Sequence, residues 1–354
     1  MTEAGPILRG AGELSVRHLD ASAEPAWEAF VQDCPEATFF HRAGWKRVLE
    51  QAFGHPGHYL YAESGGRIRG VLPLGQVKTL LFGNALVSVP FCVYGGVAAE
   101  DAEAEGALIR AARDLAESLQ VDYLELRHRQ RRLPHWPCRE DLYVTFRKAM
   151  DPDPEVNLKA IPRKQRAMVR KGIQRGLTSE EEAGIDRFFP IYADSVRRLG
   201  TPVFARRYFR DLMDTFGDAA RVTTVHHQGR PVSGVLSFLF RDEVLPYYGG
   251  GTVEARGLAA FDFLYWEVMR RACEDGYRLF DYGRSKRGTG SFHFKKNWGF
   301  VPQTLYYEYH LVRARAIPDI NPLNPRYRLF IQAWKRLPTP VANRIGPRIS
   351  RGLG

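Results

Sequence analysis

Cysteine is scarce in this sequence of 354 residues, and no two cysteines form a C-x-x-C pair. Isolated cysteines are typically buried thiols, and we expect no cysteine zinc site from them. The four residues are Cys34, Cys92, Cys138 and Cys273. The two closest histidines, His55 and His58, lie in a turn rich in Pro and Gly. Because a metal site needs three or four ligands, we expect no metal centre there either.

Long apolar runs are also few. Residues 1–16 have no basic region followed by an apolar run, so the sequence predicts no secretory signal and a cytoplasmic protein. The longest stretch without charge, residues 79–99, approaches membrane-spanning length but contains Gly83, Pro90 and Gly95. These residues interrupt a helix, so we expect two buried strands and a turn instead.

Acidic residues are fewer than basic ones, with 40 Asp and Glu against 51 Lys and Arg, which gives a net charge of +11. Two segments hold the excess. Residues 157–175 carry seven basic residues and no acid, and residues 313–354 carry nine basic residues and the single acid Asp319. The rest of the chain is close to neutral, so these two segments are expected to bind anionic partners.

Strand and helix patterns follow the same order in both halves of the chain. The segment GGRIRGVL at 65–72 has a counterpart in GRPVSGVL at 229–236, and the Tyr-Gly-Gly at Tyr94 has one at Tyr248. Amphipathic helices are predicted at 102–119 and 257–275, and each leads into a strand with an acid, Glu125 or Asp281. This repetition predicts two copies of one α/β unit with a cleft between them, which is a usual place for a ligand.

The fold class is therefore α/β (α+β), with two tandem domains followed by a basic, Pro-rich tail. The basic loop 129–132 and the prolines at 152 and 154 interrupt regular structure, so we place the first boundary there. The expected divisions are 1–150, then 151–312 with a basic helix at 157–175, and then an amphipathic tail at 313–354.

Three segments resemble the FemAB-like branch of the GNAT acyltransferase superfamily. TFFHRAGW at 38–45 is similar to the opening of the family, and 158–176 is similar to its basic inter-domain segment. DYGRSKRGTGSFHFKKNWG at 281–299 is similar to its closing motif, and this match is the most specific. The resemblance covers most of residues 38–311 and is nearest to a subgroup associated with exosortase and PEP-CTERM exopolysaccharide systems.

The resemblance implies two GNAT-like domains, each a mixed sheet flanked by helices, and an N-acyltransferase that forms an amide on a cell-envelope or exopolysaccharide precursor. The acyl donor would be a co-substrate, either aminoacyl-tRNA or acyl-CoA, with no bound cofactor. The acyl-CoA signature of ordinary GNAT domains is half present, since Gly257 and Ala259 fit its end but Glu254 stands at its start.

The resemblance also implies site residues. Lys295 of the FK motif is expected to stabilise the developing oxyanion or a substrate phosphate. Asp281 is expected to orient the amine or to pair with Arg284. The further substrate-binding residues at the same end of the second sheet are Tyr248, Arg284 and Trp298. The alternatives for these side chains are a solvated surface lysine and a structural salt bridge.

The two basic segments have their own predicted roles. Arg163, Arg166 and Arg170 recur on one helical face, and arginine forks match phosphate, so we expect them to hold an anionic precursor or a tRNA end. In the tail, residues 326–337 combine apolar positions with basic flanks. This pattern is typical of a helix on an anionic membrane, here the inner face of the cytoplasmic membrane, and equally of a helix docked on the protein core. The sequence sets no oligomeric state.

A different class of function fits the same basic segments. A non-catalytic protein that binds nucleic acid or another anionic polymer, or a scaffold of an exopolysaccharide system, would also concentrate positive charge in this way. Such a protein would bind generic RNA or DNA without turnover of an acyl donor. Few aromatic residues interrupt 157–175, which counts against stacking on single-stranded bases.

Overall fold

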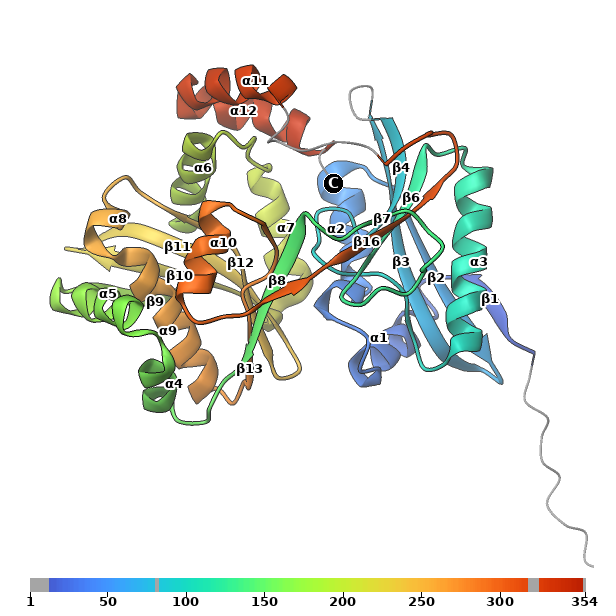
Figure 1. Cartoon of the computed structure of the whole chain (residues 1–354), viewed down its shortest axis with the longest axis horizontal. Helices are drawn as coiled ribbons and strands as arrows, with labels where there is room; N and C mark the ends of the chain where they lie inside the picture. Colours follow the sequence, from blue (N-terminus) through green and yellow to red (C-terminus); the bar gives the residue numbers. More distant parts are fainter. Residues whose placement is uncertain (1–12, 80–82, 318–324, 353–354) are drawn as a thin grey trace, which may run out of the picture.

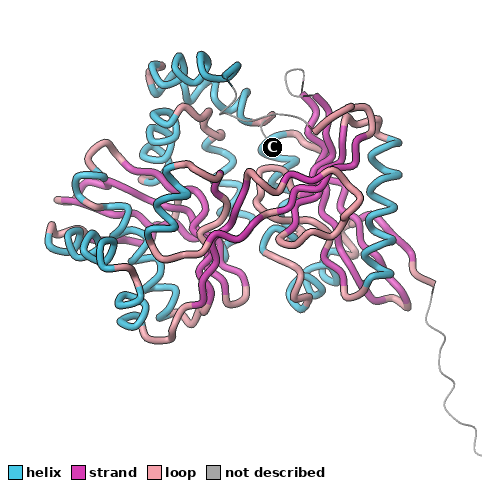
Figure 2. The backbone as a smooth tube through the Cα atoms, viewed as in Figure 1, coloured by secondary structure: helices cyan, strands magenta, loops and turns pink. Residues whose placement is uncertain are grey.

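The computed structural model of the chain describes residues 13–79, 83–317 and 325–352. Two mixed sheets lie in separate halves of the molecule, and strands that cross between the halves join them in the middle (Figure 1 and Figure 2). Helices cover both sheets, and a pair of helices near the end of the chain lies over one edge of the second half. This mixed α/β architecture with two mixed sheets confirms the expected fold class.

The first sheet contains strands from both ends of the sequence. They are β1 (Ser15–His18), β2 (Gly57–Ser64), β3 (Arg67–Thr79), β4 (Gly83–Ser88), β5 (Ala98–Ala99), β6 (Tyr123–His128), β7 (Cys138–Arg139) and β16 (Tyr306–Leu311). Their order is β1-β2-β3-β4-β6-β16-β7, with β5 beside β3. Only β4 and β6 run parallel, and the other pairs are antiparallel. The expected strand at 86–93 ends at β4, since Val89 and Phe91 have positive φ angles of 45° and 70°.

The second sheet repeats this plan. Its strands are β8 (Tyr143–Ala149), β9 (Thr178–Glu182), β10 (Ala220–His227), β11 (Arg230–Phe240), β12 (Glu243–Gly251), β13 (Leu279–Asp281), β14 (Ser285–Lys286) and β15 (Pro302–Thr304). Their order is β14-β8-β13-β12-β11-β10-β9, with β15 beside β8. The single parallel pair, β12 with β13, occupies the same place as β4 with β6 in the first sheet. The two sheets thus bear out the predicted duplication.

Sheet membership departs from the expected divisions at residues 150 and 312. β8 precedes residue 150 but pairs with β13 in the second sheet, with Asp281 opposite Arg147. β16 follows that sheet but pairs with β6 in the first, with Tyr309 opposite Glu125. Each half therefore receives a strand from the other side of the sequence. This exchange holds the halves together through backbone hydrogen bonds as well as side chains.

Helices pack on both faces of each sheet. In the first half, α1 (Glu24–Asp33) and α2 (Gly44–Phe53) cover one face and α3 (Ala102–Ser118) the other. α3 buries Ala104, Leu108 and Ala112 on one stripe, and the Asp101 side chain caps its start by accepting from Ala104 N. In the second half, α6 (Phe188–Leu199) and α7 (Arg206–Phe216) lie opposite α9 (Ala260–Glu274).

The largest core spans both halves and is rich in aromatic rings. The ring of Phe39, in the 3-10 turn η1 (Phe39–His41), stacks on Phe238 of the second sheet with centroids 4.4 Å apart. Phe53 of α2 packs against Tyr208 of α7 at 4.9 Å. The cysteines follow the expectation except at Cys138 on β7, which is only partly buried. Because this core crosses the boundary, the halves form one continuous packed unit.

Shorter helices connect and extend these layers. They are α4 (Pro154–Ala160), α5 (Arg163–Gln174), α8 (Ala255–Leu258), α10 (Gly290–Asn297), the 3-10 turn η2 (Gly217–Ala219), α11 (Pro325–Arg336) and α12 (Thr339–Ser350). The expected basic helix at 157–175 is split at Pro162, which has no N–H to continue α4 and instead begins α5. No helix in the described ranges is both long and apolar enough to span a bilayer.

Candidate functional site

A cavity of about 270 Å³ lies between the halves, with walls from both sheets. The first half contributes η1, the loop after β4 and the end of β6, and the second half contributes β8 and β15. The lining residues are Glu36, Thr38, His41, Tyr94, Gly95, Gly96, Val97, Arg127, His128, Arg129, Gln130, Arg132, Arg147 and Gln303. Four of these residues are arginines and one, Glu36, is a carboxylate.

The glycine loop of the cavity depends on very close packing. A Cβ on Gly96 would lie 2.2 Å from the His128 ring, so only glycine fits. Val97 N donates to His128 Nε2 at 3.1 Å, which leaves Nδ1 to donate to Glu308 at 2.8 Å. Glu308 also accepts from the backbone N–H of Leu133, so a single carboxylate fixes both the histidine and the loop that carries the basic side chains.

Three of the four arginines that line the cavity form ion pairs with acidic side chains. Arg127 Nε donates to Glu125 at 2.6 Å, and its Nη1 donates to the Cys92 carbonyl. The other two have further pairs that hold the walls: Arg132 with Glu36 and Glu105, and Arg147 with Glu243 and Asp281. In the part of the chain that the structure describes, Arg129 forms no ion pair. Its guanidinium lies 5.7 Å from the centroid of the Tyr94 ring, where it remains available for a ligand.

The histidine on the opposite wall carries no charge near neutral pH. His41 is 2% exposed, and burial lowers its pKa to about 4. Its Nδ1 accepts from Thr38 N at 3.0 Å, and its Nε2 donates to the Gly96 carbonyl at 2.7 Å. Both ring nitrogens are therefore used in holding the glycine loop.

A buried carboxylate connects the cavity to the second half. Asp281, at the end of β13, is fully buried and accepts from Tyr94 OH at 2.8 Å, Thr145 Oγ1 at 3.1 Å and Gly283 N at 2.7 Å. Arg147 Nε lies 3.2 Å from the same carboxylate. Burial and Asp281 raise the pKa of Tyr94 well above its usual value, so its hydroxyl stays protonated and donates. The cavity wall thus depends on hydrogen bonds between the two halves.

Comparisons with known proteins agree with this architecture. Residues 159–296 match the acetyltransferase (GNAT) domain family. The crystal structure of FemX superposes over 90% of this chain and 100% of its own, with a TM-score of 0.68 and 15% identity. Residues 159–296 therefore form a GNAT acetyltransferase domain, and the chain as a whole has the fold of FemX. No curated protein matches the sequence significantly.

Two further solved structures resemble this chain in fold. One is a tandem GNAT protein from the clavulanic acid biosynthesis pathway, with 17% identity, a TM-score of 0.52, and coverage of 87% of this chain and 100% of that one. The other is L-PGS from Bacillus licheniformis, with 14% identity, a TM-score of 0.53, and coverage of 88% and 97%. The duplicated α/β fold is thus shared along nearly the whole length of these chains.

Lys295, in the motif at residues 281–299, is enclosed. It is 8% exposed and lies on α10, where its Nζ donates to the carbonyls of Tyr282, Gly283 and Arg284 at 2.6, 3.0 and 3.1 Å. Burial lowers the pKa of Lys295 to about 7, although the negative charge of Asp281 acts in the opposite direction and raises it. All three N–H directions of the ammonium are directed at these carbonyls, and Lys295 does not line the cavity. Through these hydrogen bonds, Lys295 stabilises the turn that follows β13.

The expected pairing of Asp281 with Arg284 is not found, because Asp281 pairs with Arg147. Arg284 Nη1 donates instead to Tyr307 OH at 3.0 Å, and its guanidinium lies 4.7 Å from the Tyr143 ring. Arg284 therefore lies between the two halves but outside the cavity lining.

Two aromatic candidates lie in the core. Tyr248 is 8% exposed and its hydroxyl hydrogen-bonds Tyr208 OH at 2.7 Å. Trp298 is fully buried, and its Nε1 donates to Asp262 at 3.0 Å. The structure does not bring either ring to the cavity, and both contacts favour a packing role.

The arginines of α5 are on a different surface. Arg163 and Arg170 are exposed, and Arg166 donates to the Lys159 carbonyl. α5 packs on α9 at the outer side of the second half (Figure 1). None of the three lines the cavity between the halves. A ligand that contacts both the cavity and this face would have to be large.

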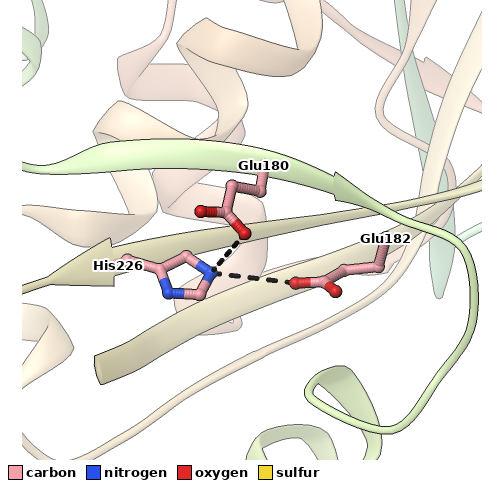
Figure 3. Close-up of side chains that lie close together, drawn as sticks. All are labelled: Glu180, Glu182 and His226. Atoms are coloured by element: carbon pink, nitrogen blue, oxygen red, sulfur yellow. Dashed lines mark ion pairs between the residues drawn. The ribbon is translucent and has the colours of Figure 1, made fainter. Parts of the chain in front are cut away.

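A second titratable cluster lies on the edge of the second sheet. Figure 3 shows His226 between Glu180 and Glu182, with its Nε2 3.9 and 3.7 Å from their carboxylate oxygens. The Thr224 hydroxyl hydrogen-bonds both His226 and Glu182, and Arg187 Nη1 lies 2.7 Å from Glu180. The cluster is a charge-compensated network, and we assign it no cation.

Most of the cavity lining carries no local signal in the sequence. The basic loop 129–132 is the exception, but its composition by itself indicates only a break between domains. Arg127 and Arg147 lie 20 residues apart on strands of different sheets, so no local spacing connects them. The exchange of β8 between the halves is what brings Arg147 to this wall.

Proposed function

We propose that the protein is an N-acyltransferase whose acceptor is an amine on a phosphate-bearing envelope or exopolysaccharide precursor, bound in the cavity between the halves. The observation that carries the proposal is the cavity between the halves, in which Arg129 has no acidic partner among the described residues. The GNAT acyltransferase fold supports acyl or aminoacyl transfer as the reaction class. The expected link to exosortase systems and the cytoplasmic location remain predictions.

The reaction needs a positioned amine and a donor for developing negative charge. The amine attacks the carbonyl carbon of an ester or thioester, a C–N bond forms, and the alcohol or thiol leaves with a proton from the amine. The tetrahedral intermediate carries an oxyanion, and one fixed donor at that oxygen typically lowers the barrier by about 3–4 kcal/mol. Transfer without a covalent enzyme intermediate requires no nucleophilic side chain.

The geometry supports a revised division of roles. Arg129 is the side chain best placed to bind substrate phosphate, because its fork is not already occupied by an acid. Asp281 fixes Tyr94 and Arg147 in the wall, and Lys295 holds the turn that carries Asp281. We propose Asp281 and Lys295 as positioning residues. Arg163, Arg166 and Arg170 remain candidates for the distal part of a long anionic ligand.

The N-termini of the two long helices, α3 and α9, help to decide which acyl donor the protein uses. Phosphates bind well at helix N-termini that are free of negative charge. α3 begins with the Asp101 cap and carries Glu103 and Glu105 in its first turn, and α9 carries Asp262 in its first turn. The negative charge of these acids would repel the pyrophosphate of CoA at the N-terminus of either helix. We therefore propose aminoacyl-tRNA as the first donor to test and acyl-CoA as the alternative.

The test compares Arg129→Gln with Arg131→Gln, which lies in the same loop but outside the cavity lining. A panel of radiolabelled acyl donors is offered with an amine acceptor that carries or lacks a phosphate. We expect Arg129→Gln to lower kcat/KM for the phosphorylated acceptor about 10- to 100-fold, the value of one hydrogen bond to a charged group. Arg131→Gln should stay within about twofold of the wild type.

Three outcomes would overturn the proposal. These are equal rates for Arg129→Gln and the wild type, no preference for the phosphorylated acceptor, and no turnover of any donor. Salt-sensitive binding of generic RNA without turnover would favour the alternative of a non-catalytic anionic-polymer or scaffold protein.

A further inference from the structure

The last two described helices, α11 and α12, follow each other closely along the chain and are called the hairpin below. Each of them packs on α6 (Figure 1). Arg197 of α6 donates to the carbonyls of Lys335 and Leu337, and Ser350 Oγ donates to the Val203 carbonyl at 3.2 Å. From the first half, His55 Nε2 hydrogen-bonds the Arg351 carbonyl at 2.6 Å. The hairpin is therefore held by contacts with both halves.

The hairpin docks through its small and apolar side chains. On α12, Ala342, Gly346 and Ser350 are buried, and a Cβ on Gly346 would lie 3.0 Å from the Val203 backbone. On α11, Trp334 is 3% exposed and stacks on Phe330 at 5.5 Å. On the apolar side of 326–337, expected to face either a membrane or the core, Trp334 is thus buried against the body, whereas Phe330 remains 40% exposed. Tyr327 lies outside the described side chains.

The outer face of the hairpin is positively charged and unpaired. Residues 325–352 contain no Asp or Glu. Arg344 and Arg348 are exposed on α12 at helical spacing, Arg351 is exposed directly after its end, and Lys335 and Arg336 are exposed on α11. None of these five side chains forms an ion pair within the described ranges. The nearby Asp194 is occupied by Arg197 and Arg198.

Exposed apolar side chains accompany this charge. Phe330 is 40% exposed and Val341 is 44% exposed. Leu199, at the end of the α6 helix on which the hairpin packs, is 70% exposed. Phosphodiester backbones need only cations, whereas the surface of an anionic bilayer accepts basic side chains together with shallow apolar ones. This combination favours a lipid surface over a nucleic acid.

We propose that the outer face of the α11–α12 hairpin docks on an anionic lipid bilayer. The attachment to α6 and His55 fixes both helices that carry these exposed cations, so no ordering of a free tail opposes binding. The association is peripheral, and its strength depends on headgroup charge and on salt. The inference concerns a surface separate from the cavity and does not require the proposed acyl transfer.

The test is co-sedimentation of the full chain with vesicles of phosphatidylcholine alone or with about 30% phosphatidylglycerol. The variant is Arg344→Gln/Arg348→Gln/Arg351→Gln. The control removes the same charge elsewhere, as Arg110→Gln/Arg113→Gln/Arg210→Gln, three exposed residues on α3 and α7. Each basic residue near an anionic surface changes partitioning about fivefold, so we expect the hairpin variant to bind about 100-fold less well. The control should lose less than about threefold.

Wild-type binding that requires phosphatidylglycerol and weakens with salt would support the proposal. Equal binding to both vesicle types, or a hairpin variant that binds as the wild type does, would overturn it. Tighter binding to RNA that competes with vesicles would assign the surface to nucleic acid instead and would also overturn it. Thermal melting and acyl-transfer assays of each variant separate a folding defect, or a failure of the proposed reaction, from loss of lipid binding.

Discussion

The hydrogen bond between Tyr94 and Asp281 joins the two halves at the cavity wall, and removing it measures how strongly they are coupled. The 2.8 Å contact is fully buried on the Asp281 side, and the acceptor is a carboxylate. A hydrogen bond to a charged group contributes about 1.5–3 kcal/mol. Tyr94→Phe should therefore cost about that much, because Asp281 keeps its bonds from Thr145 and Gly283.

Asp281→Asn should cost more. It removes the charge that faces Arg147 and replaces an acceptor-only group by an amide that must also donate. Breaking one side of a buried ion pair costs about 3–5 kcal/mol. In the double variant the shared bond is lost only once. The double variant should thus be destabilised by about 1.5–3 kcal/mol less than the sum of the two single variants.

The assay is urea unfolding of all four proteins, followed by both circular dichroism and tryptophan fluorescence. Coincident transitions are required, because the chain has two domains. A neutral pair, Tyr208 and Tyr248, provides the control: its hydroxyls lie 2.7 Å apart, and its coupling should be only about 1 kcal/mol. Additivity within about 0.5 kcal/mol for Tyr94 and Asp281 would refute the claim that this bond couples the halves.

Three further outcomes are expected. Gly96→Ala should destabilise the protein by about 1–3 kcal/mol in thermal melts, because its Cβ would lie 2.2 Å from the adjoining imidazole ring. Gly106→Ala, at a partly exposed position of α3, should be neutral or slightly stabilising. A larger loss of stability for Gly106→Ala than for Gly96→Ala would contradict the packing argument. The pKa of His41 is about 4 in the folded protein and ordinarily 6.5. Between pH 4 and pH 6.5 the unfolded chain therefore binds a proton at His41 that the folded protein does not bind. Stability should fall by about 3 kcal/mol from pH 6.5 to pH 4, and His41→Gln should flatten that part of the profile; an unchanged slope would exclude His41 as the cause. Lys295→Met should cost about 2–4 kcal/mol because three carbonyls lose their donor, whereas Lys296→Met, at an exposed position, should cost less than about 0.5 kcal/mol; equal costs would place Lys295 in solvent.

Local patterns in the sequence predicted most of the elements. The expected helix at 102–119 is α3, since its apolar residues repeat with the helical period and Asp101 precedes it as a cap. The repeated Gly-Arg segments mark equivalent turns, because Arg67 begins β3 and Arg230 begins β11. The period of a helix or strand depends on neighbours along the chain, so the sequence carries it directly.

The candidate site could be predicted from the sequence less well than the fold. Lys295 was expected near the reacting atoms, but the carbonyls that surround its ammonium come from a turn 11 to 13 residues earlier. The main-chain direction of that turn is not encoded in residue types. Likewise, Asp281 could be expected to pair with a nearby arginine, yet its partner Arg147 comes from a strand more than 100 residues away.

The sequence by itself determined the repeated α/β unit, the closing motif and the concentration of positive charge in two segments, because composition and short periodicities need no tertiary contact. Only the tertiary structure decided which surfaces carry that charge and which arginines lie together in the cavity wall. β8 and β16 exchange between the sheets, so the cavity wall is built from residues that are distant along the chain. Long-range strand pairing depends on the packing of the whole core, and this is why the cavity appears only in the folded protein.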